Sequence, residues 1–438
     1  MKKYHILWTL VTVLSLVPLV DCVAKTNGPF AKYWYFEMPT GGKVYCNILD
    51  ENARTLQIVS SLWCRYVDDD VFQFSWSRDV VQEVMYEVNL PTQVELQFHD
   101  ECYDTHRKLG IYTITSLGPK AFRGCTNLTK INLPPTITSI ESGAFEGCTS
   151  LYEINVSPNI EHIALDFANG CDKFEAINIT GNNHTGYTSF DGILCKNNEI
   201  IYCPIAIKKT DVKIPTSVKA IGSGVFANHQ VLTSVNVCSG VVIQKEAFKN
   251  CQHLHEVILD NVSGIEENAF QGCTSLTQIR IPGSVKNLGD GAFRDCGGLK
   301  TVDIHEGVIT IGNSAFANCY QLQSIPFPKS LHYINSEAFK SCSNLSDIQF
   351  NEGIIQVGIE AFCFCTSLKE IKFPTTMRTI EQKAFMGCSA LETVVFNPQI
   401  KEIERYAFFG CSSLKSANIP KSATFYEETF SECENLNL

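Results

Sequence analysis

A register of 22 or 23 residues that returns thirteen times along the chain constrains its fold more than any other feature. Each copy has an apolar anchor, usually Phe after Ala, then usually Cys three residues later and Leu or Phe three residues after that. The anchors are Phe122, Phe145, Ala168, Phe226, Phe248, Phe270, Phe293, Phe316, Phe339, Phe362, Phe385, Phe408 and Phe430. Successive anchors are 22 or 23 residues apart, except for a step of 58 residues from Ala168 to Phe226. Because such a short unit can bury its apolar face only against its neighbours, the register predicts a solenoid.

The interior of each unit indicates a short strand. Two apolar residues stand nine and eleven positions after each anchor, as Ile279 and Ile281 do after Phe270, and the residue between them is often polar. This period of two is typical of a strand that buries one face. A proline such as Pro282 often follows and ends the strand, because proline cannot donate to the sheet ladder. We therefore predict a β-rich solenoid of parallel, stacked short strands.

The unit from Leu276 to Cys296 reads L-x-x-I-x-I-P-x-x-V-x-x-L-G-x-x-A-F-x-x-C, which resembles the BspA-like leucine-rich repeats almost residue for residue. The resemblance covers about Tyr112 to Leu438 and implies a leucine-rich-repeat solenoid over residues 111–438. Members of this family are mostly surface or secreted proteins of bacteria and protist parasites, including trichomonad-type surface antigens. The resemblance therefore implies adhesion or antigen display, although leucine-rich repeats serve many partners.

The first residues have the pattern of a secretory signal. A basic start is followed by an apolar stretch and then by small residues, namely Lys2, Lys3, Ile6 to Val20, Cys22 and Ala24. We expect a signal peptide at residues 1–24, and the alternative is an anchor helix that stays attached, although the stretch is short for a membrane span. No other run approaches spanning length, and the chain ends without a hydrophobic tail. No transmembrane span is therefore expected after signal removal, and the mature chain is expected to be extracellular, either secreted or at the cell surface.

Charge and motifs exclude several classes of function. The formal net charge is -11, the isoelectric point is near 5.4 and no block of basic residues occurs, so nucleic acid is not an expected partner. No G-x-S-x-G, G-x-x-x-x-G-K, H-E-x-x-H or zinc-type C-x-x-C pattern is present. The triplet Asp68, Asp69 and Asp70 is interpreted as a solvated turn, since no calcium-loop spacing surrounds it. We predict no catalytic residue, cofactor or metal site, with an activity hidden in the N-terminal region as the enzymatic alternative.

Twelve of the twenty cysteines share one position of the register. They are Cys125, Cys148, Cys171, Cys251, Cys273, Cys296, Cys319, Cys342, Cys365, Cys388, Cys411 and Cys433. In stacked repeats these side chains run parallel, whereas a disulfide needs two Cβ atoms that turn toward each other. We therefore predict buried free thiols, with zinc binding or redox chemistry as alternatives. His229 replaces Cys in the fourth unit and is interpreted as a tolerated substitution rather than a metal ligand.

The 58-residue step indicates an insertion at about residues 181–213. The segment from Tyr187 to Pro204 predicts a β-hairpin that turns at Asn197 and Asn198. A similar hairpin interrupts many BspA-like arrays. Cys195 and Cys203 lie in this segment and are candidates for a cross-strand disulfide, with two free thiols as the equal alternative.

Residues 25–110 differ in composition from the repeats. They hold every Trp outside the signal, namely Trp34, Trp63 and Trp76, and the alternating Tyr33 and Tyr35 and the segment Val84 to Leu90 suggest strands. We predict an N-terminal β-rich cap region that covers the first repeat. An aromatic binding module is the alternative. Its cysteines are Cys46, Cys64 and Cys102, of which one pair is a plausible disulfide.

Residues eight and ten positions after each anchor point away from the predicted core and form two columns. Neither column contains an aromatic residue, which interfaces favour, so a merely solvated face remains an alternative. Candidate glycosylation sequons occur at Asn127, Asn155, Asn178, Asn183, Asn261 and Asn344. Asn155 and Asn178 lie in the inner column, where glycans would obstruct a ligand. We therefore predict that a ligand of this face contacts its C-terminal half, at Arg280, Asp303, Gln349 and Lys372.

The sequence thus predicts a secreted or cell-surface recognition protein, possible partners being host or neighbouring-cell surface proteins or extracellular matrix. Adhesion or antigen display would use the repeat surface. The alternative is a non-adhesive structural component of a surface coat or self-assembling layer, which would associate through an open terminal edge of the solenoid.

Overall fold

The structure is a computed structural model of the chain. It describes residues 21–25, 34–38, 42–50, 55–60, 87–90, 92–100, 105–181 and 184–436. The chain divides into two compact units, Met1–Tyr187 and Thr188–Leu438. Nearly all regular structure is β, and η1 (Glu427–Phe430), one turn of 3-10 helix, is the only helical element in the described ranges.

The first unit contains a mixed β-sheet with the strand order β1-β6-β7-β4-β3-β2. The bounds are β1 (Asp21–Lys25), β2 (Trp34–Met38), β3 (Gly42–Asp50), β4 (Thr55–Ser60), β6 (Gln93–Asp100) and β7 (Thr105–Leu117). The pairs β1·β6 and β4·β7 are parallel, and the other pairs along this path are antiparallel. Apart from Asp21–Ala24 in β1, the predicted signal segment lies outside the described residues, as do Cys64, Cys102 and the triplet Asp68, Asp69 and Asp70.

Repeat strands follow in the same unit. On one side β7 pairs in parallel with β9 (Ser139–Ile140), which pairs with β11 (His162–Ile163). On the other side the parallel order is β5-β8-β10-β12, with the bounds β5 (Glu87–Asn89), β8 (Lys130–Asn132), β10 (Glu153–Val156) and β12 (Ala176–Ile179). Because β5 is in register with β8, repeat-type pairing begins inside residues 25–110, the range predicted as a cap.

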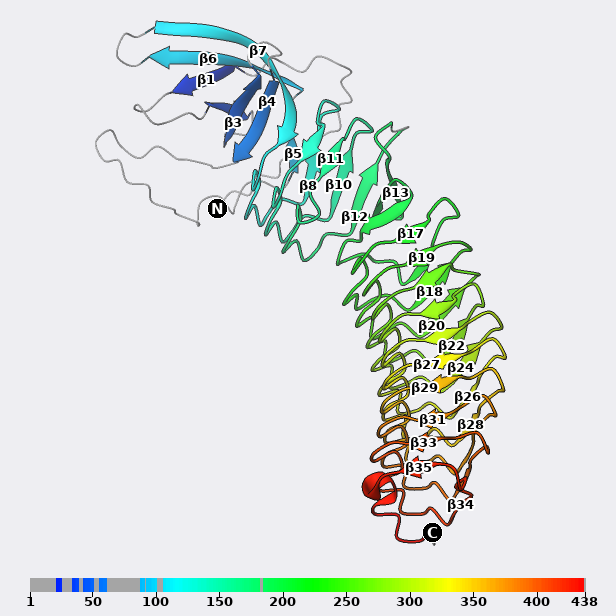
Figure 1. Cartoon of the computed structure of the whole chain (residues 1–438). Coiled ribbons are helices and arrows are strands. Elements are labelled where there is room, and N and C mark those ends of the chain that lie inside the picture. Colours follow the sequence, from blue (N-terminus) through cyan, green and yellow to red (C-terminus); the bar gives the residue numbers. More distant parts are fainter. Residues whose placement is uncertain are drawn as a thin grey trace, which may run out of the picture. The chain divides into compact units, whose positions relative to one another are not determined.

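The second unit repeats this arrangement with two rows of parallel strands (Figure 1). The strands that follow the anchors form the long-strand face: β16 (Asp211–Lys213), β18 (Ser234–Val237), β20 (Glu256–Leu259), β22 (Gln278–Ile281), β24 (Thr301–Ile304), β26 (Ser324–Pro326), β28 (Asp347–Gln349), β30 (Glu370–Lys372), β32 (Thr393–Val395) and β34 (Ser416–Ala417). The strands that precede the anchors form the short-strand face: β17 (Ala220–Ile221), β19 (Val242–Ile243), β21 (Gly264–Ile265), β23 (Asn287–Leu288), β25 (Thr310–Ile311), β27 (Tyr333–Ile334), β29 (Gln356–Val357), β31 (Thr379–Ile380), β33 (Glu402–Ile403) and β35 (Thr424–Phe425). The predicted solenoid of parallel short strands is confirmed.

Aromatic stacking organises the core of the second unit. The anchor rings from Phe226 to Phe430 form one continuous stack, with centroids of neighbouring rings 4.9–5.5 Å apart and interplanar angles of at most 12°. A second stack of Phe327, Phe350 and Phe373 meets the first edge to face. Both geometries are favourable for aromatic pairs. The long-strand face therefore stands on a densely packed apolar core.

The hairpin prediction is confirmed. Strand β14 (Ile193–Lys196) pairs antiparallel with β15 (Glu199–Tyr202), and Asn197 and Asn198 both have positive φ, 50° and 65°, as a tight two-residue turn requires. The ten-stranded sheet of the short-strand face begins with β13 (Tyr187–Phe190), β14 and β15. Because β15 pairs in parallel with β17 and β16 pairs with β18, the insertion also contributes a repeat of its own.

Candidate binding surface

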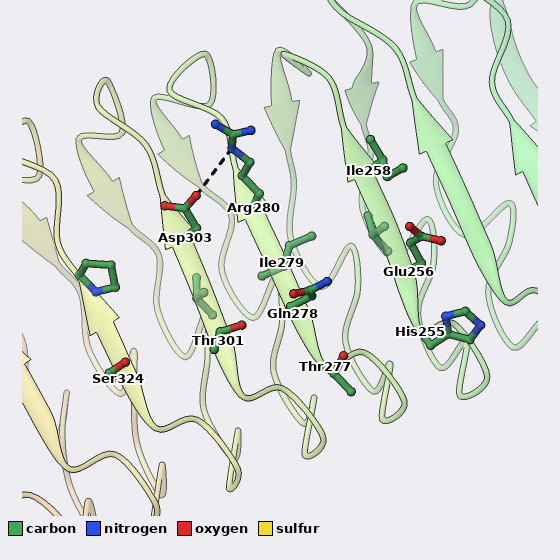
Figure 2. A pocket seen from close by; sticks show the side chains of 13 residues that line it. His255, Glu256, Ile258, Thr277, Gln278, Ile279, Arg280, Thr301, Asp303 and Ser324 are labelled. Carbon is green, nitrogen blue, oxygen red and sulfur yellow. Dashed lines mark ion pairs between the residues drawn. The ribbon is translucent and has the colours of Figure 1, made fainter.

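Two adjoining grooves lie on the long-strand face. The larger has a volume of about 720 Å³ and the smaller about 230 Å³, and they share Glu256 and Ile258. The larger groove is lined by His255, Glu256, Val257, Ile258, Thr277, Gln278, Ile279, Arg280, Thr301, Val302, Asp303, Ser324 and Pro326, and Figure 2 shows how these side chains are placed. The smaller groove is lined by Asp211, Lys213, Ser234, Val235, Asn236, Glu256 and Ile258. Together they extend from β16 to β26.

Strand alternation positions the side chains of the grooves. In β20, β22 and β24 the first and third residues are exposed and the second and fourth are buried, as the period of two predicts. The parallel register pairs Gln278 with Thr301 and Arg280 with Asp303. The exposed side chains therefore form two columns, confirming the predicted geometry of the face.

Arg280, Asp303 and His305 form a polar cluster in the larger groove and at its edge. Arg280 Nε lies 3.6 Å from Asp303 Oδ2 and 2.6 Å from His305 Nε2, and His305 Nε2 lies 3.0 Å from Asp303 Oδ2. Figure 2 shows Arg280 and Asp303 pointing toward each other from neighbouring strands. The side chains of Arg280 and Asp303 are 68% and 62% exposed, so this ion pair contributes at most about 1 kcal/mol to stability. Its main effect is to orient the guanidinium group.

The four residues predicted as a ligand face lie on one side of the second unit, but the structure places only Arg280 and Asp303 in the groove. Gln349 pairs with Pro326 in the register of β26 and β28, and Lys372 ends β30. Both are on the same column, beyond the groove. The grouping at Arg280 and Asp303 was thus predicted correctly, and the extent of the hollow was not.

The sequence analysis missed two charged residues of the smaller groove. Asp211 and Lys213 are the exposed ends of β16, in the repeat contributed by the insertion, and Ser234 Oγ donates a hydrogen bond to Asp211 Oδ1. The segment Val212-Lys213-Ile214-Pro215 has the same I-x-I-P spacing as Ile279 to Pro282. This half of the repeat pattern was the signal that could have revealed them.

The register cysteines are free and buried, as predicted. From Cys148 onward, each thiol in the stack donates a hydrogen bond to the carbonyl oxygen of the anchor Phe one repeat earlier, with Sγ to O distances of 2.9–3.3 Å. Burial raises the pKa of Cys251, Cys296 and Cys342 to about 12. These thiols therefore carry almost no thiolate at neutral pH, which makes them poor nucleophiles and metal ligands. Within the described ranges no group of three or more His, Cys, Asp or Glu has the geometry to hold a metal ion.

The predicted disulfide between Cys195 and Cys203 is not formed in this structure. Both thiols are free and buried, and burial raises the pKa of each. A register shift between Leu194 and Cys195 pairs Cys195 with Ile200, and Tyr202 with Leu194. The strand partner of Cys195 is therefore not Cys203.

His229 occupies the thiol position of the fourth unit and is 2% exposed. Its Nδ1 atom has no hydrogen-bond partner, while a hydrogen bond to the backbone of Cys203 engages the ring. Burial lowers its pKa, and the hydrogen bond to Cys203 opposes this shift. His229 is thus a neutral core residue, in line with the predicted substitution.

The sequons differ in their surroundings. Asn261 and Asn344 are exposed outside the strands, and Asn127 is half-buried in a turn. Asn155 and Asn178 face each other across β10 and β12, where Asn178 Nδ2 donates to Asn155 Oδ1 at 3.1 Å. Asn183 lies outside the described residues. Glycosylation of all six remains a prediction.

A search of the described residues finds no helix with the length and apolar character needed to span a membrane.

The comparisons with known proteins agree with this geometry. A family model described as BspA type leucine rich repeat region (6 copies) matches residues 101–209, 205–323 and 309–437. A leucine-rich repeat protein from Bacteroides ovatus is 19% identical, with 92% of this chain and 99% of that chain covered and a TM-score of 0.54. A leucine rich cell surface protein from Faecalibacterium prausnitzii is 22% identical, with 94% of each chain covered and a TM-score of 0.41. At these identities the likeness concerns the fold alone. No curated protein matches the chain significantly.

Proposed function

Because this chain belongs to the BspA-type leucine-rich-repeat family, a family of surface proteins, we propose that it is an adhesive recognition protein. It acts outside the cell, secreted or held at the cell surface, and binds a host or neighbouring-cell surface protein or a component of the extracellular matrix. The repeats present the binding residues and perform no chemistry, as is typical of leucine-rich-repeat proteins.

The observation that carries this proposal is the pair of adjoining grooves on the long-strand face. Exposed polar and charged side chains from six neighbouring strands line them, and the apolar residues of the same strands are buried beneath. Binding sites built on strands are held more rigidly than sites on loops. The stacked Phe core fixes these strands, so the columns can meet a partner with little loss of conformational entropy.

The test is saturable binding of the mature chain, starting near Lys25, to mucosal epithelial cells. A face variant with Ala at Arg280, Asp303, Gln349 and Lys372 should bind at least about tenfold more weakly, because loss of a few central contacts dominates interface energies. A matched control replaces one exposed residue of each same type away from this face with Ala, at Arg294, Asp172, Gln356 and Lys401. The control should bind like the wild type.

Two outcomes would contradict the proposal. Equal binding by the face variant and the wild type would remove the long-strand face from the mechanism. No saturable binding at micromolar concentration, together with a molar mass that rises with protein concentration, would instead support a structural role in a surface layer.

A further inference from the structure

We propose that the larger groove binds an extended protein segment in which an Asp or Glu side chain stands beside an aliphatic side chain. Arg280 holds the carboxylate and Ile258 contacts the aliphatic group. This inference deepens the proposed function and rests on it, since it names the class of partner that the same face recognises.

Arg280 is prepared for a carboxylate by its own contacts. Its Nε atom faces Asp303 and His305, at 3.6 and 2.6 Å. Its two terminal nitrogens make no hydrogen bond or ion pair within the described part of the chain, and Figure 2 shows them at the end of the side chain, away from Asp303. A planar guanidinium group with a free outer edge binds a carboxylate through two parallel hydrogen bonds. Because the inner edge is already engaged, less rotamer freedom is lost when a ligand binds.

The charges around Arg280 leave room for one more anion. Asp303 is the one carboxylate that contacts the guanidinium, and it is shared with His305 Nε2 at 3.0 Å. The other lining residues of β22, β24 and β26 that face the groove are uncharged, namely Thr277, Gln278, Thr301, Ser324 and Pro326. Charge complementarity therefore favours an acidic group at the exposed edge of Arg280.

Ile258 supplies the apolar part of the site. Its side chain is 46% exposed at the position where the two grooves meet. In Figure 2 it stands on β20, next to the strand that carries Arg280. The equivalent residues of the adjacent repeats are Asn236 and Arg280, so an exposed isoleucine here breaks a polar column. An apolar centre with a polar rim is the usual anatomy of a protein interface.

Spacing and lining favour a polypeptide over a sugar. Neighbouring strands lie about 4.8 Å apart, and side chains on one side of an extended segment recur every 6.6 Å or so, a difference that the long Arg280 side chain can span. The lining residues include no Trp, Tyr or Phe on which a sugar ring could stack. The open shape of the groove also suits a segment that crosses several strands.

The test is selection of random short peptides displayed on phage against the immobilised full mature chain. We expect the selected sequences to be enriched in Asp or Glu beside Ile, Leu or Val. Arg280→Gln should weaken the best peptide at least about tenfold, the usual value of a charge-assisted hydrogen bond, and Arg280→Lys should restore only part of the affinity. Ile258→Asn should also weaken it. Matched controls are Arg294→Gln on a turn and Ile309→Asn on the short-strand side, which should bind like the wild type, and circular dichroism shows whether each variant is folded.

Three results would overturn the inference. They are the absence of any enriched peptide, enrichment without acidic residues, and affinity that does not change in Arg280→Gln. Displacement of the selected peptide by sialyllactose or heparin at concentrations below those of a competing acidic peptide would point to a glycan instead. If epithelial binding is lost in the four-residue face variant but kept in both Arg280→Gln and Ile258→Asn, the proposed function stands and this inference fails.

Discussion

At the scale of single residues, the recurrent cysteine has a physical explanation. The carbonyl oxygen of each anchor Phe is buried between repeats, and the thiol one repeat later donates to it, as Cys319 does to Phe293 at 3.3 Å. An unpaired buried carbonyl costs about 1–3 kcal/mol. Cysteine combines a small apolar body with a weak donor, so it fills this position without a polar atom left over. Its role in the repeats is therefore structural.

His229 gives the first prediction, because it has no such match. Its folded-state pKa is lowered below 6.5 by burial, so below that pH the unfolded chain binds more protons than the folded chain. His229 therefore makes the free energy of unfolding fall as pH drops from 6.5 toward the lowered folded-state pKa, by at most about 1.4 kcal/mol per pH unit. Urea unfolding of wild type and His229→Cys at pH 7.5 and 5.0 measures this, and the variant should lose less stability on acidification. The exposed His253→Gln is the control and should behave like the wild type, whereas equal pH dependence of His229→Cys and wild type would refute the assignment.

Gly387 gives a second prediction at this scale. Its φ is +72°, a conformation that costs an L-residue about 1–2 kcal/mol. An added Cβ would also lie 2.5 Å from the Phe364 ring, which covers this glycine. Gly387→Ala should therefore lower the free energy of unfolding by about 2 kcal/mol. In a Phe364→Asn background the same change should have a smaller effect, and urea titration of all four proteins measures the coupling; a coupling energy of zero would mean that the ring does not contribute.

At the scale of elements, the ring stack sets the energetics of each repeat. Phe316 is fully buried between Phe293 and Phe339, with centroids 5.5 and 5.3 Å away, whereas Phe430 has one stacked neighbour and is 8% exposed. Phe316→Ala should lower the free energy of unfolding by about 3–5 kcal/mol. Phe430→Ala should lower it by clearly less, because part of its site is already open. Denaturant midpoints of the two variants decide this, and equal losses would contradict a stack that acts through both neighbours.

The repeats were predictable from the sequence because their pattern encodes burial directly. Ile279 and Ile281 are buried and Arg280 is exposed, as a period of two requires. Strands β5 and β16 were not predicted as repeat strands, because their repeats lack the Phe and Cys half of the pattern and keep only the strand half. Short-range periodicity thus identifies complete repeats and passes over partial ones.

The candidate site was predictable only in part. The columns follow from the offsets, and so does the proximity of Arg280 and Asp303 once parallel register is assumed. The hollow itself depends on side-chain length and on the added strand β16, which no offset from an anchor reveals. The failed pairing of Cys195 has a similar cause, since a register shift inside the hairpin has no signature in the spacing of residues.

At the scale of the whole molecule, stability is expected to be local. Each repeat contacts its neighbours through strands and rings, so the free energy of opening one repeat depends on the repeats beside it and little on distant ones. Opening can therefore begin at different places with different free energies, and the buried thiols provide a reporter in almost every repeat.

Alkylation of the native chain should reveal this order. A thiol reacts only when its repeat opens, because the thiolate is the reactive form and burial raises the pKa of the interior thiols. With N-ethylmaleimide and mass spectrometry of the digested protein, half-buried Cys238 should be labelled first, Cys433, 9% exposed, next, and Cys319, 0% exposed, much later. The same labelling in concentrated denaturant is the control and should make the three rates similar. Similar rates in the native protein would mean that the repeats open together, and the local account of stability would then be wrong.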